Sequence, residues 1–196
     1  MSTPTTLTPT LLETERLHLR LVTPEVYGHV MSTASDQEIM ACFGFRTEEE
    51  LKTEKENFAK GYQTYYISFA NFYLQDKLSG EVVGRCGFHT WIPKHRRAEV
   101  GYHLIEEKDR GKGLMTEALG PILAYGFEQM NLYRVEALLA ADNQPSYKLL
   151  KRHGFKEEGT IRGHYVVDGV NEDSLLVSLL LPEFQQLKST WGLLQV

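Results

Sequence analysis

The sequence predicts an α+β fold, in which a mixed, mostly antiparallel central sheet is flanked by helices. Segments that alternate apolar and polar residues, as half-buried strands do, recur along the chain and enclose a few segments with helical periodicity. Several of the strand-like segments are joined by short turns, which is typical of antiparallel hairpins. The length of 196 residues favours one domain, expected over residues 13–196, after a flexible Thr- and Pro-rich tail over residues 1–12.

The first third of the chain is expected to form one strand and two helices. Apolar and polar residues alternate over residues 16–22, which predicts a half-buried strand. Thr23 can cap a helix and Pro24 suits the first helical position, so a helix should begin there and break near Gly44. A second helix is expected over residues 47–60, since a threonine cap precedes three glutamates in its first turn.

The middle of the chain is expected to form three strands and a long helix. Apolar residues recur at three- and four-residue spacing from about Gly111 onward, which predicts the helix, and Pro121 is expected to kink it. The strands are expected over residues 69–75, 82–90 and 98–105, with a turn at residues 76–80.

The last third is expected to form a strand, a short helix and a closing hairpin. Gly154 is expected to end the helix, and the Asp168-Gly169 dipeptide is expected to turn the hairpin. The strands are expected over residues 133–141, 155–167 and 174–181, and the helix over residues 146–153.

Composition excludes several classes of function. The formal net charge of −5 argues against a nonspecific nucleic-acid binder, which usually presents a basic face. Cys42 and Cys86 stand far apart in apolar surroundings, and the histidines lack the spacing of zinc ligands, so no metal site is expected. No segment has the roughly 18 apolar residues of a membrane span or the pattern of a signal peptide. We therefore expect a cytoplasmic protein without a membrane partner.

The segment most informative about function runs from a predicted strand at residue 104 through a loop into the long helix. Gly111 and Gly113 let the backbone turn tightly and approach a ligand. Free N–H groups at the start of the helix favour anions, and Arg110 and Lys112 add positive charge beside them. The segment predicts a pyrophosphate cradle. The alternative is an ordinary glycine-rich helix start whose charges are solvated and bind no ligand.

Two common phosphate-binding motifs do not fit this loop. A Walker loop requires Ser or Thr directly after its lysine, but Lys112 is followed by Gly113. The dinucleotide fingerprint requires a third glycine at the position of Thr116.

Four segments in order resemble the GNAT superfamily of N-acetyltransferases. Arg110-Gly111-Lys112-Gly113-Leu114-Met115 is similar to the family's Arg/Gln-x-x-Gly-x-Gly/Ala loop, with Met115 in the last place. Residues 143–155, from Asn143 to a Gly-Phe pair, are similar to the family's Asn-x-x-Ser/Ala helix. Residues 14–20 and 158–162 resemble the subgroup that contains the Rim-type ribosomal-protein N-terminal acetyltransferases.

This resemblance implies the fold, the reaction and the coenzyme contacts. The fold would be the GNAT-like acyl-CoA N-acyltransferase fold, and the reaction would transfer acetyl from acetyl-CoA, a co-substrate, to a primary amine without a metal. Pantetheine and the thioester would lie along the strand that precedes the loop. The implied coenzyme contacts are Tyr102, His103, Leu104, Ile105, Arg110, Gly111, Lys112, Gly113, Leu114, Met115, Thr116 and Asn143.

Acetyl transfer also requires a group that takes the amine proton. Glu99 shares a strand face with Gly101 and His103 and is a candidate to accept this proton through water. A surface carboxylate is the simpler alternative. His103 is a second candidate base, although a lone strand histidine is more often simply packed.

The departing thiolate needs a proton, for which the motif position indicates Ser146. A first-turn helix serine with no chemical role is the alternative reading of this residue. Many family members carry a tyrosine as general acid seven residues after the asparagine, but this chain has Leu150 there. Ser146 is therefore the default candidate.

The sequence leaves the acceptor open. A protein N-terminal amine and a small amine such as a polyamine, amino sugar or antibiotic are both compatible with the resemblance. A non-catalytic acyl-CoA-binding sensor is the alternative from another class, because such a protein would retain the loop and not the acid and base.

Overall fold

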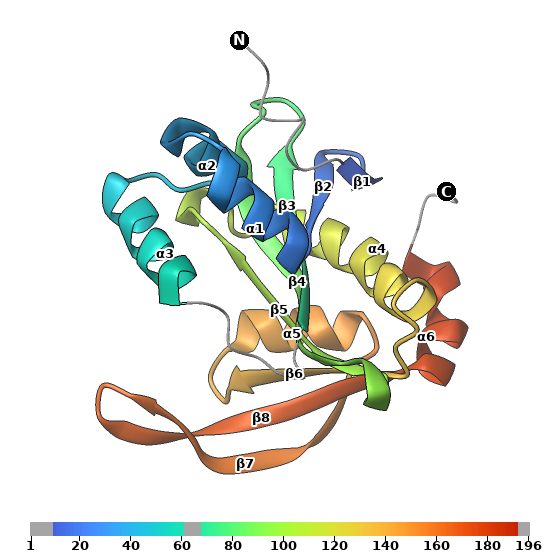
Figure 1. Ribbon diagram of the computed structural model, residues 1–196. Coiled ribbons are helices and arrows are strands. Elements are labelled where there is room, and N and C mark those ends of the chain that lie inside the picture. The colour runs from blue at the N-terminus through green and yellow to red at the C-terminus, as the bar shows by residue number, and fades with distance from the viewer. Residues whose placement is uncertain (1–9, 61–67, 192–196) are drawn as a thin grey trace.

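The computed structural model describes residues 10–60 and 68–191, which form one eight-stranded sheet with helices on both faces (Figure 1). The strands are β1 (Thr10–Glu13), β2 (Leu17–Val22), β3 (Ser68–Asp76), β4 (Val82–Ile92), β5 (Arg97–Leu104), β6 (Arg134–Ala140), β7 (Lys156–Val167) and β8 (Val170–Leu180). The helices are α1 (Pro24–Thr33), α2 (Asp36–Phe43), α3 (Glu48–Lys60), α4 (Leu114–Glu128), α5 (Gln144–Arg152) and α6 (Leu181–Leu187), with short 3-10 turns η2 (Pro93–His95), η3 (Glu107–Asp109) and η4 (Lys188–Trp191).

The sheet has the order β1-β2-β3-β4-β5-β6-β8-β7 and is antiparallel except where β5 meets β6. This arrangement confirms the predicted α+β class. Each expected strand is present, and the helices expected after residue 46 are present too, with ends that differ by a few residues. α4 continues as one helix through Pro121. None of the helices in the described part of the chain has the length and apolar content needed to cross a bilayer.

The structure differs from the sequence-based expectation in three places. β1 includes residues 10–12, which we expected in the flexible tail, and it pairs with β2. The helix expected from Pro24 to about Gly44 is two helices, because Ser35 forms a capping box with Glu38 and starts α2. α6, which begins directly after β8, was not expected at all.

Local side-chain chemistry explains where the first helices begin and end. The Thr23 hydroxyl accepts a hydrogen bond from the N–H of Val26, which satisfies a free donor at the start of α1. α2 ends at Gly44, whose φ of +78° is in the left-handed region. A Cβ on Gly44 would lie 2.7 Å from Ile105 Cδ1, so the position requires glycine for space as well as conformation.

Two apolar clusters hold the helices against the two faces of the sheet. One packs α4, α5 and α6 against the strands, and Phe127 of α4 stacks on Phe184 of α6 at a ring distance of 4.6 Å. The other packs α1, α2 and α3 against the opposite face. Cys86 lies in the first cluster and Cys42 in the second, and both thiols are buried, as the sequence predicted. Burial raises the pKa of the Cys86 thiol.

The strands β5 and β6 pair over only a short distance. Their parallel register covers Arg97 with Arg134, Ala98 with Val135, and Glu99 with Glu136. β6 instead pairs along its whole length with β8, while β5 pairs with β4. The sheet is therefore continuous up to Glu99 and divides into two parts beyond it, at the strand that the sequence predicted to hold pantetheine.

Candidate functional site

The loop between β5 and α4 has the geometry of an anion cradle. Gly111 and Gly113 are exposed and have φ values of +73° and +79°. Gly113 caps α4 without a side chain, so no N-cap side chain accepts the N–H groups of the first helical turn. The N-terminal end of the helix dipole adds positive potential at the same place.

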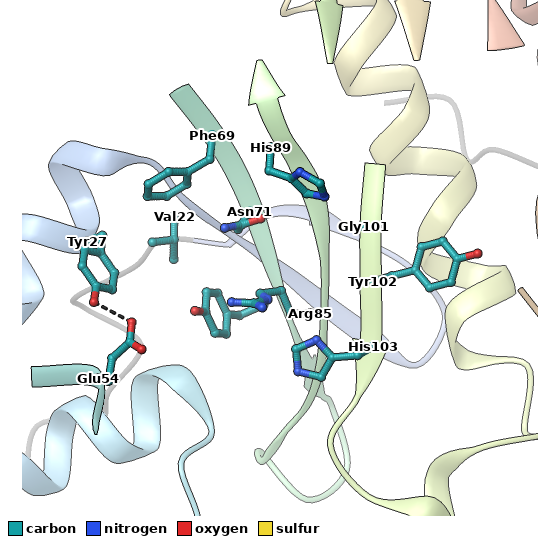
Figure 2. A pocket seen from close by; sticks show the side chains of 11 residues that line it. Val22, Tyr27, Glu54, Phe69, Asn71, Arg85, His89, Gly101, Tyr102 and His103 are labelled. Carbon is teal, nitrogen blue, oxygen red and sulfur yellow. Dashed lines mark hydrogen bonds between the residues drawn. The ribbon is translucent and has the colours of Figure 1, made fainter. Parts of the chain in front are cut away.

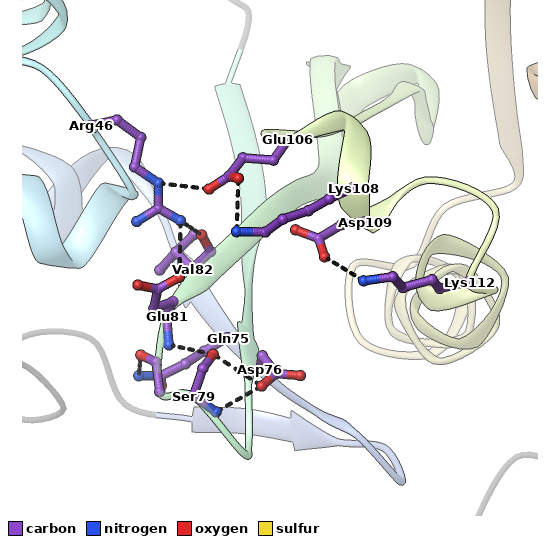
Figure 3. A network of polar contacts seen from close by, with 11 residues as sticks. Arg46, Gln75, Asp76, Ser79, Glu81, Val82, Glu106, Lys108, Asp109 and Lys112 are labelled. Carbon is purple, nitrogen blue, oxygen red and sulfur yellow. Dashed lines mark hydrogen bonds and ion pairs between the residues drawn. The ribbon is translucent and has the colours of Figure 1, made fainter.

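Two cationic side chains of this loop lie beside carboxylates, and Figure 3 shows the pair of Lys112 with Asp109. Lys112 Nζ is 3.2 Å from Asp109 Oδ1, while an Nη1 of Arg110 is 3.5 Å from Glu107 Oε1. Both cations remain more than half exposed. Glu107 is exposed as well, whereas Asp109 is buried, so the Lys112 ion pair has one buried partner.

Two further arginines, which sequence reasoning missed, reach the same loop from elsewhere in the fold. Arg16 Nη1 donates to the carbonyl of Lys112 at 3.0 Å. Its Nη2 lies 3.7 Å from the position that a Cβ on Gly113 would occupy. Arg152, near the end of α5, donates from Nη1 to Thr116 Oγ1 at 3.4 Å. Only tertiary packing brings these residues to the loop, so no local sequence signal could have identified them.

The four predicted pantetheine contacts at the end of β5 differ in what they offer. His103 is exposed, whereas Leu104 is partly buried against the main core. Ile105 donates its N–H to the carbonyl of Val83 at 2.9 Å, so that donor is already engaged. Tyr102 points its ring away from the cavity on the α1–α3 side, as Figure 2 shows.

The Tyr102 hydroxyl bridges the gap between β5 and α5. It donates to the carbonyl of Ser146 at 3.4 Å. Burial raises the pKa of this phenol to about 12, so it is protonated at neutral pH. The structure thus brings Tyr102 and the predicted proton donor Ser146 together, which the sequence did not indicate.

Asn143 and Ser146 contact each other at the start of α5. Asn143 caps the helix, and its Oδ1 accepts the N–H of Ser146 at 3.2 Å. Ser146 is half-buried. Leu150, at the family's tyrosine position, is 1% exposed and belongs to the core.

A cavity of about 410 Å³ opens between β3, β4 and β5 on one side and α1 and α3 on the other (Figure 2). A second cavity of about 570 Å³ shares Glu54, Tyr73, Arg85 and His103 with it, so the two are adjacent. The polar side chains that line the first cavity, apart from Tyr102, whose ring points away, are Tyr27, Glu54, Asn71, Tyr73, Arg85, His89 and His103.

The described lining of this cavity contains one guanidinium, that of Arg85, and one carboxylate, that of Glu54. The pKa of His89 and that of His103 are lowered by burial and, next, by the Arg85 guanidinium. Both imidazoles are therefore neutral at pH 7. Glu54 accepts a hydrogen bond from the Tyr27 hydroxyl at 2.6 Å.

Glu99 lies behind this cavity rather than in its lining. Burial raises its pKa, the neighbouring Glu136 raises it further, and Arg97 opposes the shift. Its Oε2 is 3.7 Å from Nδ1 of His89. Sequence reasoning missed His89, although its place on the polar face of the strand 82–90 was visible.

The chain is similar to known acetyltransferases along most of its length. A family model described as an acetyltransferase (GNAT) domain matches residues 16–156. An uncharacterized N-acetyltransferase of Bacillus subtilis, YoaA, is 31% identical over 175 residues, which cover 88% of this chain and 97% of that protein. The [ribosomal protein uS5]-alanine N-acetyltransferase of Escherichia coli is 31% identical over 113 residues, which cover 58% of each chain.

Solved structures support the fold. The spermidine N-acetyltransferase of Vibrio cholerae in complex with CoA and spermine superposes with a TM-score of 0.63 and is 20% identical. The match covers 87% of this chain and 98% of that one.

Proposed function

Since this chain belongs to the GNAT family and is an acetyl-CoA-dependent N-acetyltransferase, we propose that its acceptor is the α-amine of a protein N-terminus. The observation that carries the proposal is the Arg85 guanidinium in the wall of the acceptor cavity. The Arg85 charge repels a second ammonium group, which every polyamine brings with it. A peptide instead brings one ammonium group followed by backbone carbonyls, which the guanidinium can bind.

The proposed donor site consists of the loop and the strand predicted from the sequence. Residues 110–116 would bind the pyrophosphate through the glycine backbone, the first turn of α4 and the two cations. Residues 102–105 would line the pantetheine arm, with Asn143 on its other side. The acetyl group would then lie beyond Glu99, where β5 and β6 separate and where the backbone of Gly101–His103 borders the acceptor cavity.

The chemistry in this site is a direct transfer. The lone pair of the amine nitrogen forms a bond to the thioester carbon, and the C–S bond breaks with its electron pair on sulfur. The proposed proton donor to that sulfur is Ser146, which lies beside the protonated Tyr102 hydroxyl. The α-amine of a peptide has a pKa of about 8, compared with about 10.4 for a lysine-type amine, so a weak base suffices to deprotonate it.

The space supports an extended acceptor. The two adjacent cavities each fall in the ordinary range of ligand sites, about 300 to 1,000 Å³. Together they can accept the N-terminal residue in the first cavity and the next residues of the peptide in the second. The similarity to the ribosomal-protein enzyme of Escherichia coli agrees with such an acceptor.

A polyamine is the second candidate, favoured by three glutamates of α3 around the second cavity. Two of these carboxylates already have partners, because Glu50 accepts the backbone N–H of Arg46 and Glu54 accepts the Tyr27 hydroxyl. Glu49 is the third. A spermidine N(1)-acetyltransferase of Escherichia coli is 27% identical to this chain over 90 residues.

A competition between acceptors tests the proposal. Release of CoA thiol is followed with acetyl-CoA and peptides that carry a free N-terminus, the same peptides with a formyl-blocked N-terminus and an internal lysine, spermidine and an amino sugar. We expect kcat/KM to be at least tenfold higher for the free peptides, with mass spectrometry locating acetyl on the α-nitrogen. Preference for spermidine would overturn the proposed acceptor, and CoA binding without turnover of any amine would support the sensor instead.

A further inference from the structure

His89 lies in the wall of the acceptor cavity with its two ring nitrogens in different surroundings. Nε2 lies over Gly101, close enough that a Cβ on that glycine would be 2.7 Å away. Nδ1 faces Glu99 Oε2 at 3.7 Å and Thr90 Oγ1 at 3.2 Å. The side chain of His89 is 45% exposed, whereas that of Glu99 is only 15% exposed, so the carboxylate lies behind the ring.

The backbone beside His89 is unusual. Thr90 has a φ of +48°, a left-handed conformation that is rare for a β-branched residue. The pairing of β4 with β5 shifts register between His89 and Ile92, which marks a bulge. The strained residue brings its hydroxyl to Nδ1 of the neighbouring imidazole, and strain of this kind occurs most often at functional sites.

Gly101 provides the space that the His89 ring occupies. It lies on β5 opposite Gly87, and its backbone conformation is one that any residue can adopt. The contact that excludes a side chain there is with the His89 ring, at Nε2 and Cδ2. The absence of a Cβ thus leaves room for the imidazole against the part of β5 that borders the acceptor cavity.

We propose that Nε2 of His89 is the general base that takes the proton of the acceptor amine, and that Glu99 and Thr90 position the ring through Nδ1. Two acceptor atoms near Nδ1 favour the tautomer with its proton there, which leaves the lone pair on Nε2 free. Glu99 then stabilises the imidazolium that forms. This inference rests on acetyl transfer in this cavity and is independent of which amine is the acceptor.

The protons balance in this scheme. The acceptor enters as an ammonium ion, and Nε2 removes one proton so that the nitrogen has a lone pair for attack. After the C–N bond forms, the nitrogen loses a second proton, and the departing sulfur gains one as the C–S bond breaks. The first proton passes from His89 to solvent, so each turnover releases one proton overall.

The charges around His89 come from several elements. Arg85 of β4 and burial both lower its pKa and keep it neutral, while Glu99 favours the protonated ring. The other titratable groups that line this cavity or face Glu99 are Tyr27, Glu54, Tyr73, Arg97, His103 and Glu136. Of the two histidines in the cavity wall, His89 is the one whose Nδ1 faces a carboxylate, that of Glu99.

The main test compares wild type with His89→Gln at saturating acetyl-CoA and peptide. The ratio of their kcat values cancels the ionisation of the peptide itself. We expect a ratio of about 100 or more at neutral pH, which falls as pH decreases because protonated His89 accepts no proton. His103→Gln is the matched control, and its ratio to wild type should not vary with pH. A His89→Gln ratio below about 3, or one independent of pH, would overturn the proposal.

Two more variants separate the base from a structural role. Gly101→Ala keeps the imidazole but displaces it, so we expect kcat to fall at least about tenfold with the KM for acetyl-CoA and the Tm unchanged. Glu99→Gln should shift the acidic fall of kcat to lower pH, because the imidazolium loses its counter-charge. Long-range ¹H–¹⁵N spectra of wild type should show the proton of neutral His89 on Nδ1, and a proton on Nε2 would contradict the scheme.

Discussion

Arg16 and Glu117, 101 residues apart in the chain, form a two-point contact. The backbone N–H of Arg16 donates to Glu117 Oε1 at 2.8 Å, and its Nε donates to Oε2 at 2.6 Å. The Thr14 hydroxyl donates to the same carboxylate. Since Glu117 is in the first turn of α4, this contact ties the β1–β2 hairpin to the helix end that bears the glycine loop.

Replacing Glu117 with Ala should therefore weaken both the fold and the donor site. We expect the free energy of unfolding to fall by about 1 to 2 kcal/mol, because three donors lose a charged acceptor, and the KM for acetyl-CoA to rise. Urea unfolding at pH 7 and steady-state kinetics measure the two effects. Equal stability of variant and wild type would show that the contact carries no net energy.

The same contact predicts a pH dependence. Burial works to raise the pKa of Glu117, but hydrogen bonds from Thr14 and Arg16 outweigh it and lower the pKa below the usual value. A lowered folded-state pKa gives stability that is present above the unfolded-state pKa of about 4.3 and is lost as pH falls through the folded-state value. The difference in the free energy of unfolding between wild type and Glu117→Ala should therefore shrink as pH falls below the unfolded-state pKa. Urea unfolding across a pH series checks this.

Gly113 offers a charge test of the anion cradle. Asp and Asn have nearly the same shape, and both tolerate the left-handed conformation of this position better than other side chains do. Gly113→Asp should therefore raise the Kd for CoA by about tenfold more than Gly113→Asn, because its carboxylate would face the pyrophosphate. Calorimetric titration with CoA measures both. Identical affinities would argue against phosphate binding at this loop.

Ser146 and Tyr102 can be separated as proton donors to the leaving sulfur. Ser146→Ala removes the hydroxyl but keeps the backbone carbonyl that accepts from Tyr102. If Ser146 is the donor, kcat should fall at least about tenfold with little change in the Kd for CoA. If Tyr102→Phe instead causes the larger fall in kcat, the Tyr102 phenol is the general acid, in place of the family's tyrosine at the position of Leu150. Unchanged kcat in Ser146→Ala would remove it from the mechanism.

Arg85 provides a test of the electrostatics in the acceptor cavity. Burial and then the Arg85 charge lower the pKa of His89. Arg85→Gln removes the charge, so the His89 pKa should rise and the acidic fall of kcat should move to higher pH. The same variant should improve kcat/KM for spermidine relative to a peptide. A pH profile and an acceptor ratio identical to those of wild type would contradict the proposed role of this guanidinium.

Features that depend on local sequence were predictable. The cap at Asn143, the glycines of the loop and the start of α1 at Pro24 follow from chemistry within a few residues. The α+β class followed from the alternation of apolar residues and the turns between strands. The division of the first helix into α1 and α2 is also encoded locally, because Ser35 and Glu38 have the spacing of a capping box. We did not predict it, because the helical pattern continues on both sides of Ser35.

Features that depend on tertiary contacts were not predictable. Arg16 and Arg152 reach the loop only because β1–β2 and α5 pack around α4. His89 becomes a candidate base only when strand pairing brings Glu99 beside it and a glycine opposite its ring. Thr10–Glu13 forms a strand because it pairs with the edge of β2, although the Thr- and Pro-rich composition predicted a flexible tail up to residue 12.

The parting of β5 from β6 after Glu99 has a consequence for the fold itself. From that point no strand of the described residues lies beside one edge of β5, so the hydrogen-bonding capacity of this part of the sheet is incomplete. The amide groups of a bound pantetheine arm along this edge would form the missing hydrogen bonds with β5 while the donor is bound. In the register of β5 with β4, the N–H groups of Gly101, His103 and Ile105 point to β4, so those of Tyr102 and Leu104 face the open edge. The amides of Tyr102 and Leu104 would then exchange with solvent more slowly when CoA is bound, and hydrogen exchange would report how much of the protein carries the donor.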